Sequence, residues 1–465
     1  HPLRNHAAPL LRLDSSCLCP HYTQAVMKGA LGQFIDHDLT FDPASSLQKV
    51  NDPDALVDFR TPRFDLDNLY GRGPDDQPYM YQGDGVRFVL GRALTGNSDD
   101  ASSRDLQRTA GGRAIIGDPR NDENVIISQL QAAFLRFHNR VADVLKASGP
   151  RDFAKVQEVV RWHYQWVVLH DFLPTIIGKD MLFSILPHLG SGKSILHDRP
   201  ILRFYQPQKE PYMPVEFSVA AYRFGHSMVR PQYRLNEVTP PVEGNPDPSG
   251  KNDPRLPIFS STALSLVGFN EFPSTWAVDW RLFFKLGIAP PSGKNRIQPA
   301  YKIDTSLVNP LGKLPEVVTG PTPVPSLALR NLLRSLRMGL PSGQAVARAM
   351  GEPIIPDEEL RVGKANEDDF KNNPTLASIS SEFSRNAPLW YYVLADSQNA
   401  FKDNNTPIRL GRIGGRIVGE VFAGILLGDH HSFLNHCPNW KPHAELAASD
   451  GTFGIADLIK QAMQA

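Results

Sequence analysis

The sequence has little of several features that usually narrow a protein's class. Among its 465 residues are only three cysteines, and basic and acidic side chains are equal in number, 49 of each. Such a balance gives no electrostatic argument for a nucleic acid or an anionic membrane as partner. No apolar run approaches the roughly 20 residues that cross a bilayer, the best candidate being the short segment 421–427. The sequence therefore predicts a soluble protein with a small or neutral ligand.

The cysteines and the start of the chain say little about its compartment. Three cysteines cannot all pair within one chain, and Cys17 and Cys19 are too close for an easy mutual disulfide. The chain begins at His1 without an apolar signal core, which indicates processing or trimming. Export therefore stays open.

Strand alternation and internal repeats are also scarce, whereas helical periodicity is frequent. Apolar residues recur at spacings of three and four along 122–147, which predicts a helix with one core-facing stripe. Comparable patterns predict further helices over 154–173, 215–229, 326–338, 342–350, 388–396 and 410–427. Proline and glycine gather in 239–257, 288–299 and 311–325, which we expect to be long irregular connections. The prediction is a mainly α fold with little β structure, one large domain over 1–465, in which 1–20 is an extension wrapped on the core.

The segment Gly32–Asp38 is the most informative stretch, because a histidine lies between two acids in apolar surroundings. His37 is flanked by Asp36 and Asp38, and Gln33 precedes it by four residues. Burying an imidazole beside two carboxylates is costly unless each acid has its own partner, such as a cation or a covalent link. The segment is a candidate site for acid–base chemistry.

Three further polar segments each allow two interpretations. In Thr61–Gly71, Asp65 and Asp67 suit either a solvated turn or a hard cation that takes six to eight oxygens. In Gly117–Asn124, Asn121 or Asp122 is a candidate helix cap, but Arg120 is a cation where the helix dipole disfavours one. In Tyr222–Pro231, His226 is either an ordinary helical histidine or a ligand, and Gly225 beside it would let a flat group approach.

Together and in this order, these segments resemble the animal-type haem peroxidases, the superfamily of myeloperoxidase, lactoperoxidase and the cyclooxygenases. The residues of these motifs are most similar to those of bacterial members. The C-terminal segments Leu389–Tyr392 and Gly411–Arg416 also look like the family. The resemblance implies the helical haem-peroxidase domain, haem b and calcium as cofactors, and hydrogen peroxide as the oxidant.

The resemblance also assigns roles to residues around the haem. It implies that His37 is the distal acid–base group, that Gln33 lies beside it, and that Arg120 stabilises the charge that develops as the O–O bond breaks. On the other side it implies His226 as iron ligand, Asn331 as the acceptor for its second ring nitrogen and Arg223 facing a haem propionate. Asp36 and Glu123 fall where several mammalian members attach the haem through ester bonds.

The calcium ligands that the resemblance implies are Asp38, Thr61, Arg63 through its carbonyl, Asp65 and Asp67. Family members often carry serine in place of Asp67, so one more negative charge is expected here. In this arrangement Asp36 would face the haem edge, His37 the peroxide and Asp38 the calcium ion.

The substrate class follows from a departure from the family pattern. Asn124 stands where myeloperoxidase has a methionine that makes a sulfonium link to the haem, which puts chloride oxidation in doubt. The resemblance therefore implies a ferryl intermediate that oxidises bromide, iodide, thiocyanate or small aromatic donors.

A fatty-acid dioxygenase of the same superfamily is one alternative. Such enzymes use a tyrosyl radical three residues before the iron-ligating histidine, but here that position holds Arg223, and Tyr222 lies one residue away. A catalytically silent haem-carrying adhesion protein is the other. The family favours an extracellular or periplasmic location, and the oligomeric state is not predicted.

Overall fold

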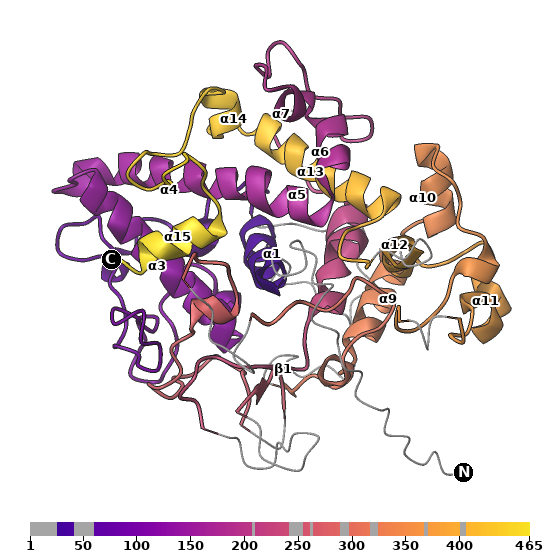
Figure 1. Cartoon of the computed structure of the whole chain (residues 1–465), viewed down its shortest axis with the longest axis horizontal. Coiled ribbons are helices and arrows are strands. Elements are labelled where there is room, and N and C mark those ends of the chain that lie inside the picture. Colours follow the sequence, from indigo (N-terminus) through magenta and orange to yellow (C-terminus); the bar gives the residue numbers. More distant parts are fainter. Residues whose placement is uncertain are drawn as a thin grey trace.

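The computed structural model describes residues 26–40, 60–206, 210–240, 254–260, 264–288, 297–316, 324–366, 371–399 and 406–465. Within these ranges the prediction of a mainly α fold is confirmed, since helices dominate and the regular strands are β1 (Gln232–Tyr233) and β2 (Leu256–Pro257), paired antiparallel. The predicted extension 1–20 lies outside the described residues, as do parts of the three Pro- and Gly-rich connections. Figure 1 shows helices gathered around a central one and β1 below it among loops.

The helices of the N-terminal half include those predicted over 122–147 and 154–173, and several that periodicity did not predict. They are α1 (Val26–Leu39), α2 (Asp67–Tyr70), η3 (Pro78–Met80), η4 (Pro119–Asp122), α3 (Val125–Val144), η5 (Pro150–Asp152), α4 (Phe153–Val167), η6 (Val168–Phe172), α5 (Leu173–Ile176), α6 (Lys179–Ile185), α7 (Pro187–Ser191), η7 (Glu216–Ala220) and η8 (Ala221–Met228). The helix predicted over 154–173 is a run in which η6 is a single π-helical stretch between α4 and α5.

The C-terminal half contributes further α-helices and short helical turns between them. They are η9 (Trp280–Leu282), η11 (Asn309–Gly312), α9 (Leu327–Arg337), α10 (Gly343–Met350), η12 (Asp357–Glu359), α11 (Leu376–Ile379), η13 (Ser381–Phe383), α12 (Leu389–Gln398), α13 (Arg412–Gly428), α14 (Phe433–His436) and α15 (Ile455–Ala462). The predictions for α9, α10, α12 and α13 are correct to within two residues.

The helix predicted over 215–229 is present, but it is not an α-helix. It consists of the π-helix η7 followed directly by the 3₁₀-helix η8, and Ala220 at the junction has φ −127° and ψ −71°. A π-helical turn inside a helix is frequent at functional sites. This change of helix type sets the direction in which residues 221–228 project.

Helix α1 lies in the middle of the molecule, in contact with α3 on one side and η8 on the other (Figure 1). Its apolar residues Leu31, Phe34, Ile35 and Leu39 are fully buried. Phe34 stacks on Phe134 of α3 with 4.4 Å between ring centroids. A helix buried on several sides cannot show a single apolar stripe, which explains why periodicity did not predict α1.

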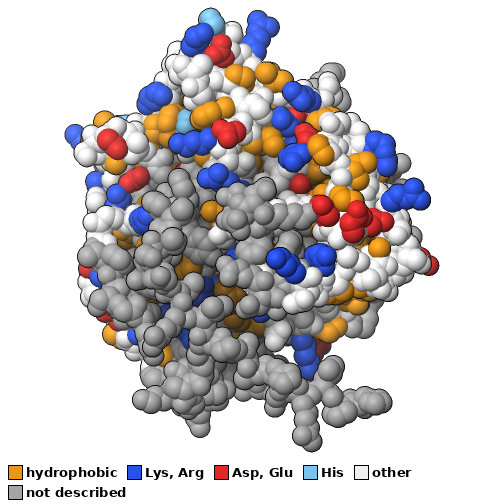
Figure 2. Space-filling model, turned by 45° about the vertical axis from the view of Figure 1, so that its right-hand side comes forward, with side chains coloured by type: hydrophobic (Ala, Val, Ile, Leu, Met, Phe, Trp, Pro, Cys, Tyr) orange, Lys and Arg blue, Asp and Glu red, His pale blue; other side chains and the backbone are white. Residues whose placement is uncertain are grey.

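The surface carries charges of both signs, as the balanced composition predicts. On the face in Figure 2, basic and acidic side chains are intermixed among the described residues, with small apolar areas between them. In the described part of the chain, no helix is both long and apolar enough to cross a membrane.

Candidate active site

His37 lies near the C-terminal end of α1, where Asn121 of η4 and Glu123 approach its side chain. Its side chain is almost completely buried, and its Nδ1 lies 2.6 Å from Oδ1 of Asn121 in η4. Burial, followed by the positive charge of Arg120, lowers the pKa of His37 to about 4. The imidazole is therefore neutral at pH 7, which is the form that accepts a proton.

Gln33 and Glu123 meet on the face of α1 that carries His37. Positions four apart share a helix face, so Gln33 lies one turn before His37. Gln33 Nε2 donates a hydrogen bond to Glu123 Oε1, and the same oxygen is 4.0 Å from Nε2 of His37. Burial raises the pKa of Glu123 to about 7, against the opposing effect of Arg120. The side chains of Gln33, His37 and Glu123 thus form one polar cluster.

Arg120 lies beside His37, but its nearest anion is a residue that the sequence argument did not consider. Its guanidinium pairs with Asp118, with 2.7 Å between Nη2 and Oδ2, and also donates to the carbonyls of His37 (3.1 Å) and Thr40. These carbonyls are at the C-terminal end of α1, where the helix dipole favours a cation. Asp118 is thus an anion that accounts for a cation at this position, and pairing with Arg120 lowers the pKa of Asp118 although burial opposes it.

The predicted helix cap at Asn121 or Asp122 is wrong. Asn124 caps α3 by accepting a hydrogen bond from the backbone N–H of Ile126, and Asp118 caps η4 in the same way. Asp122 instead forms a two-pronged ion pair with Arg108, with N–O distances of 2.8 Å at both prongs. The cap and this ion pair fix η4 and therefore fix both Arg120 and Glu123.

His226 lies on η8, where Asn331 contacts it directly and Arg223 contacts Asn331. Its Nδ1 is 2.9 Å from Nδ2 of Asn331 in α9, so Asn331 donates to the ring here and is not the acceptor that was predicted. The reason is that Asn331 Oδ1 is turned away to accept a hydrogen bond from Arg223 at 3.3 Å. Burial, followed by Arg223, lowers the pKa of His226 to about 3, so its ring is neutral. A methyl group added at Gly225 would meet nothing within 4 Å, so open space lies beside His226.

Asp36 links the His37 side and the His226 side electrostatically. Its charge acts on Arg120 and Glu123 near His37 and also on Arg223 of η8. Burial lowers the pKa of Arg223 to about 10, and Asp36 counteracts that effect. Asp36 therefore acts on charged groups in both halves of the site that the sequence predicted.

Asp65 and Asp67 of the acidic loop 61–71 lie near enough to Asp38 to affect its pKa, but the acids that the structure describes do not form a complete set of metal ligands. Burial, followed by the charges of Asp65 and Asp67, raises the pKa of Asp38 well above its ordinary value, and burial raises that of Asp65 to about 7. Both carboxylate oxygens of Asp38 are buried and lack a hydrogen-bond partner among the described residues.

The remaining predicted calcium ligands are less well placed. Asp67 turns toward Arg161, with 3.6 Å between Oδ1 and Nη2, and Thr61 is exposed. Arg63, whose carbonyl was the predicted ligand, directs its side chain to Glu210. In the part of the chain that the structure describes, no three His, Cys, Asp or Glu side chains converge closely enough to hold a metal ion.

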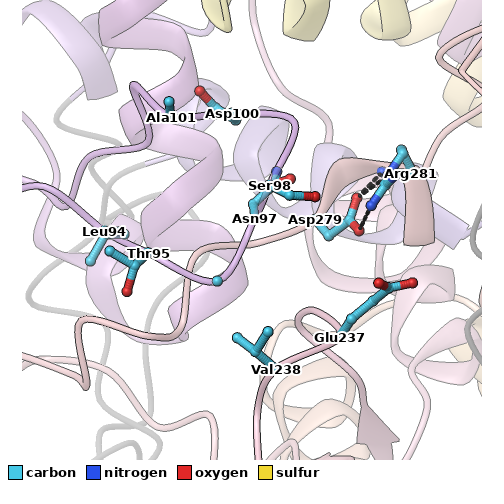
Figure 3. A pocket seen from close by; sticks show the side chains of 11 residues that line it. Leu94, Thr95, Asn97, Ser98, Asp100, Ala101, Glu237, Val238, Asp279 and Arg281 are labelled. Atoms are coloured by element: carbon cyan, nitrogen blue, oxygen red, sulfur yellow. Dashed lines mark hydrogen bonds and ion pairs between the residues drawn. The ribbon is translucent and has the colours of Figure 1, made fainter.

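A pocket of about 510 Å³ opens elsewhere, between the 94–101 loop and residues near η9 (Figure 3). None of the predicted site residues lines it. Arg281 at its wall is held by Asp279 at 2.7 Å and by Asp99 at 2.5 Å, so its charge is already matched.

Sequence reasoning missed Asn121 and Gln131 as site residues. Asn121 contacts His37, and its Nδ2 donates to Oε1 of Gln131 at 2.8 Å. Gln131 is fully buried in α3 but stands beside the apolar stripe and not on it. A buried glutamine requires hydrogen-bond partners, but periodicity gave no sign that this polar position would be buried.

Comparisons with known proteins fit this arrangement. Residues 44–257 match the family model described as animal haem peroxidase, a match that begins after the His37 segment. Chorion peroxidase of Drosophila melanogaster is 33% identical over 184 residues, covering 37% of this chain and 22% of that protein. Human myeloperoxidase is 26% identical over 182 residues, covering 38% and 20% respectively. The matched regions thus make up less than a third of these relatives' own length.

Solved structures share the fold over a much larger part of the chain. Peroxidase A from Dictyostelium discoideum aligns with a TM-score of 0.58 at 17% identity, covering 90% of this chain and 83% of that one. The fatty acid alpha-dioxygenase of Oryza sativa aligns with a TM-score of 0.59 at 14% identity, covering 95% and 72%. At these identities the likeness concerns the fold alone. The family match over residues 44–257 and the relatives confirm the resemblance of this chain to the animal haem peroxidases.

Proposed function

We propose that this protein is a haem peroxidase that uses hydrogen peroxide to oxidise a halide, thiocyanate or a small aromatic donor. The observation that carries the proposal is the pairing of two neutral histidines, His37 and His226, on two segments that pack against each other, α1 and η8. One neutral imidazole can serve as base and the other as metal ligand. The family match supports the same chemistry.

The residues near His226 fit a haem group. Its neutral ring offers a nitrogen donor, and the open space at Gly225 leaves room for a flat ring. For Nε2 to bind iron the proton must be on Nδ1, so the Asn331 amide would have to turn its oxygen toward Nδ1 when haem binds. Arg223 is a buried cation that suits a propionate carboxylate. When bound, haem would supply the iron centre at which peroxide is reduced.

The residues around His37 then handle the proton and the charge. His37 Nε2 accepts a proton from one oxygen of hydrogen peroxide and returns it to the other oxygen, which leaves as water. Gln33 orients groups at this position through its amide. Arg120 contributes positive charge beside the developing anion, and Asp118 keeps its guanidinium fixed.

Asp36 and Glu123 are the carboxylates that we propose as sites of covalent haem attachment. Their placement supports this, since Glu123 faces His37 and Asp36 interacts with charges on both sides of the site. Extraction with acidic acetone separates free haem from ester-linked haem. Haem that leaves the protein completely would rule out the ester bonds and leave the peroxidase proposal intact.

We propose a calcium ion at Asp38, bound with Asp65, Asp67, Thr61 and the carbonyl of Arg63. The support is the buried, unpartnered carboxylate of Asp38, which a cation would satisfy. Asp67 and Thr61 would have to turn inward to join it. We therefore expect removal of calcium with a strong chelator to lower the melting temperature, and Asp38→Asn to abolish this response to the chelator.

A matched control for the calcium experiment is Asp99→Asn, which changes an acid that is paired with Arg281. It should keep the response to the chelator. A melting temperature that is identical with and without calcium in the wild-type protein would contradict the site.

The proposed function is tested with purified protein expressed with ample haem. We expect a Soret absorption band and peroxide-dependent oxidation of iodide, bromide or guaiacol. Absence of the band would overturn the proposal. Oxygen uptake with linoleate and no added peroxide would favour the dioxygenase alternative, for which the fold likeness to the rice enzyme is the supporting observation. A haem-containing protein without either activity would favour the silent adhesion protein.

A further inference from the structure

We propose that Asn121 and Gln131 are positioning residues that fix the proton of His37 on Nδ1 and leave Nε2 as the proton acceptor. The inference deepens the proposed function and rests on it for its catalytic meaning. It concerns a buried chain of hydrogen bonds that joins four segments, α1, η4, α3 and α2.

The chain of contacts is continuous from the imidazole to the backbone. His37 Nδ1 lies 2.6 Å from Asn121 Oδ1, and Asn121 Nδ2 donates to Gln131 Oε1 at 2.8 Å. Gln131 Nε2 donates to the carbonyl oxygen of Asn68 at 3.4 Å. Asn121, Gln131 and Asn68 are fully buried, so water does not compete with these bonds.

The backbone carbonyl of Asn68, at the end of this series of hydrogen bonds, decides which group donates and which accepts in each of them. A carbonyl oxygen accepts hydrogen bonds and never donates them, so the amide group of Gln131 facing Asn68 must be its NH₂. Its oxygen then faces Asn121 and must receive the NH₂ of that residue. The oxygen of Asn121 therefore faces His37, and Nδ1 of His37 must carry the proton that is donated.

The opposite direction leaves oxygen facing oxygen. If Nδ1 of His37 lacked a proton, Asn121 would turn its NH₂ to the ring and its oxygen to Gln131. Gln131 would then direct its own oxygen at the carbonyl of Asn68, leaving two buried acceptors without a donor. An unsatisfied buried polar group costs about 1–3 kcal/mol. The observed direction is the one that satisfies every bond in the chain.

The anchor at Asn68 is itself tied to α1. Its Nδ2 donates to the carbonyl of Phe34 at 3.1 Å, one helical turn before His37. This chain of hydrogen bonds, which we call the relay, thus begins and ends on α1. It holds the ring of His37 at Nδ1, while Nε2 lies 4.0 Å from Oε1 of Glu123. In this tautomer Nε2 has a lone pair, so a peroxide O–H bond can break with its proton passing to Nε2.

The sharpest test is a pair of substitutions at position 131 with opposite hydrogen-bond character. A carboxylate in Gln131→Glu only accepts, so it keeps the direction of Asn121 and the proton on Nδ1. An ammonium group in Gln131→Lys only donates, so it should turn the Asn121 amide and move the His37 proton to Nε2. Nitrogen-15 chemical shifts of ¹⁵N-histidine distinguish the two tautomers directly in the protein as purified, and in the diamagnetic ferrous carbon monoxide form of the holoenzyme. A purely structural role would affect both variants alike.

A kinetic measurement accompanies the NMR measurement. In Asn121→Leu we expect a roughly 10- to 100-fold slower change of the Soret band on mixing with peroxide, with the later reaction with the donor unchanged. Asn121→Asp keeps an accepting oxygen and should restore most of the rate. The matched control is Gln129→Leu, which removes another buried glutamine of α3 whose amide bonds to the backbone of Trp276 and Val278. It should leave both the tautomer and the rate unchanged.

The outcomes separate this inference from the proposed function. A wild-type His37 with its proton on Nε2, or a tautomer that is the same in Gln131→Glu and Gln131→Lys, overturns the relay even if the protein is an active peroxidase. Absence of haem overturns the proposed function, while the tautomer is still measured in the purified protein. If Asn121→Leu does not fold, the pair at position 131 still decides.

Discussion

Replacing His37 with leucine should slow peroxide-dependent iodide oxidation by about 10²- to 10⁴-fold at neutral pH, the range that a positioned general base contributes. Burial and Arg120 lower the pKa of His37 to about 4, so the wild-type ring is neutral and able to accept a proton above that pH. The wild-type rate should therefore fall as the pH drops toward 4, because the ring becomes protonated. The rate is measured per haem, from the Soret absorbance.

A matched control for His37 is His138→Gln. His138 is equally buried, with Nδ1 3.0 Å from the hydroxyl of Tyr70 and Nε2 2.9 Å from the carbonyl of Val86, and it has no contact with α1 among its hydrogen bonds. Its loss should reduce stability without reducing the rate per haem. Equal rates in His37→Leu and the wild type would show that another group takes the peroxide proton.

Replacing His226 with alanine should abolish stable haem binding. Changes to groups around a metal ligand typically cost 10- to 100-fold in affinity, so loss of the ligand itself should cost more than about 100-fold. Ligand binding at about 100 times Kd adds about 2.7 kcal/mol of stability. Wild-type protein should therefore melt at a higher temperature when haem is added, and His226→Ala should not. The Soret band and thermal melting measure both effects.

The control for His226 is His170→Ala, a half-buried histidine of η6 that stacks on Trp166 with 3.8 Å between ring centroids. It should keep the Soret band. An unchanged haem content in His226→Ala would mean that the iron ligand is another residue, and the assignment of η8 to the haem would be wrong. Asn331→Leu should lie between these extremes, since it leaves His226 in place and removes its hydrogen bond to Nδ1 together with the one from Arg223.

Helices with a single buried face were predictable, whereas α1 was not. Helix α3 begins within three residues of the predicted start, because its apolar residues recur on one side. In α1 buried apolar residues surround the polar ones, so no stripe exists to detect. Sequence periodicity also cannot tell an α-helix from the π- and 3₁₀-helical turns of η7 and η8, which differ in hydrogen-bond pattern and only slightly in spacing.

The family resemblance predicts individual site residues, but it does not predict the residues that contact them. His226, Asn331 and Arg223 were predicted together and lie in contact. Asp118, Asn121 and Gln131 were missed, because their roles depend on which segments the fold brings together around His37. A short motif contains no information about a hydrogen bond that spans 84 residues, as the one between His37 and Asn121 does.

The position of α1 between its neighbours has a consequence for how this chain can change over evolutionary time. Successive residues of a helix point roughly 100° apart, so Asp36, His37 and Asp38 face three different surroundings within less than one turn. Insertion or deletion of one residue upstream in α1 would rotate all three by that angle at once, toward neighbours that suit none of them. Single substitutions in this helix can be accepted one at a time. A change of its length would require compensating substitutions around Asp36, His37 and Asp38 at the same time.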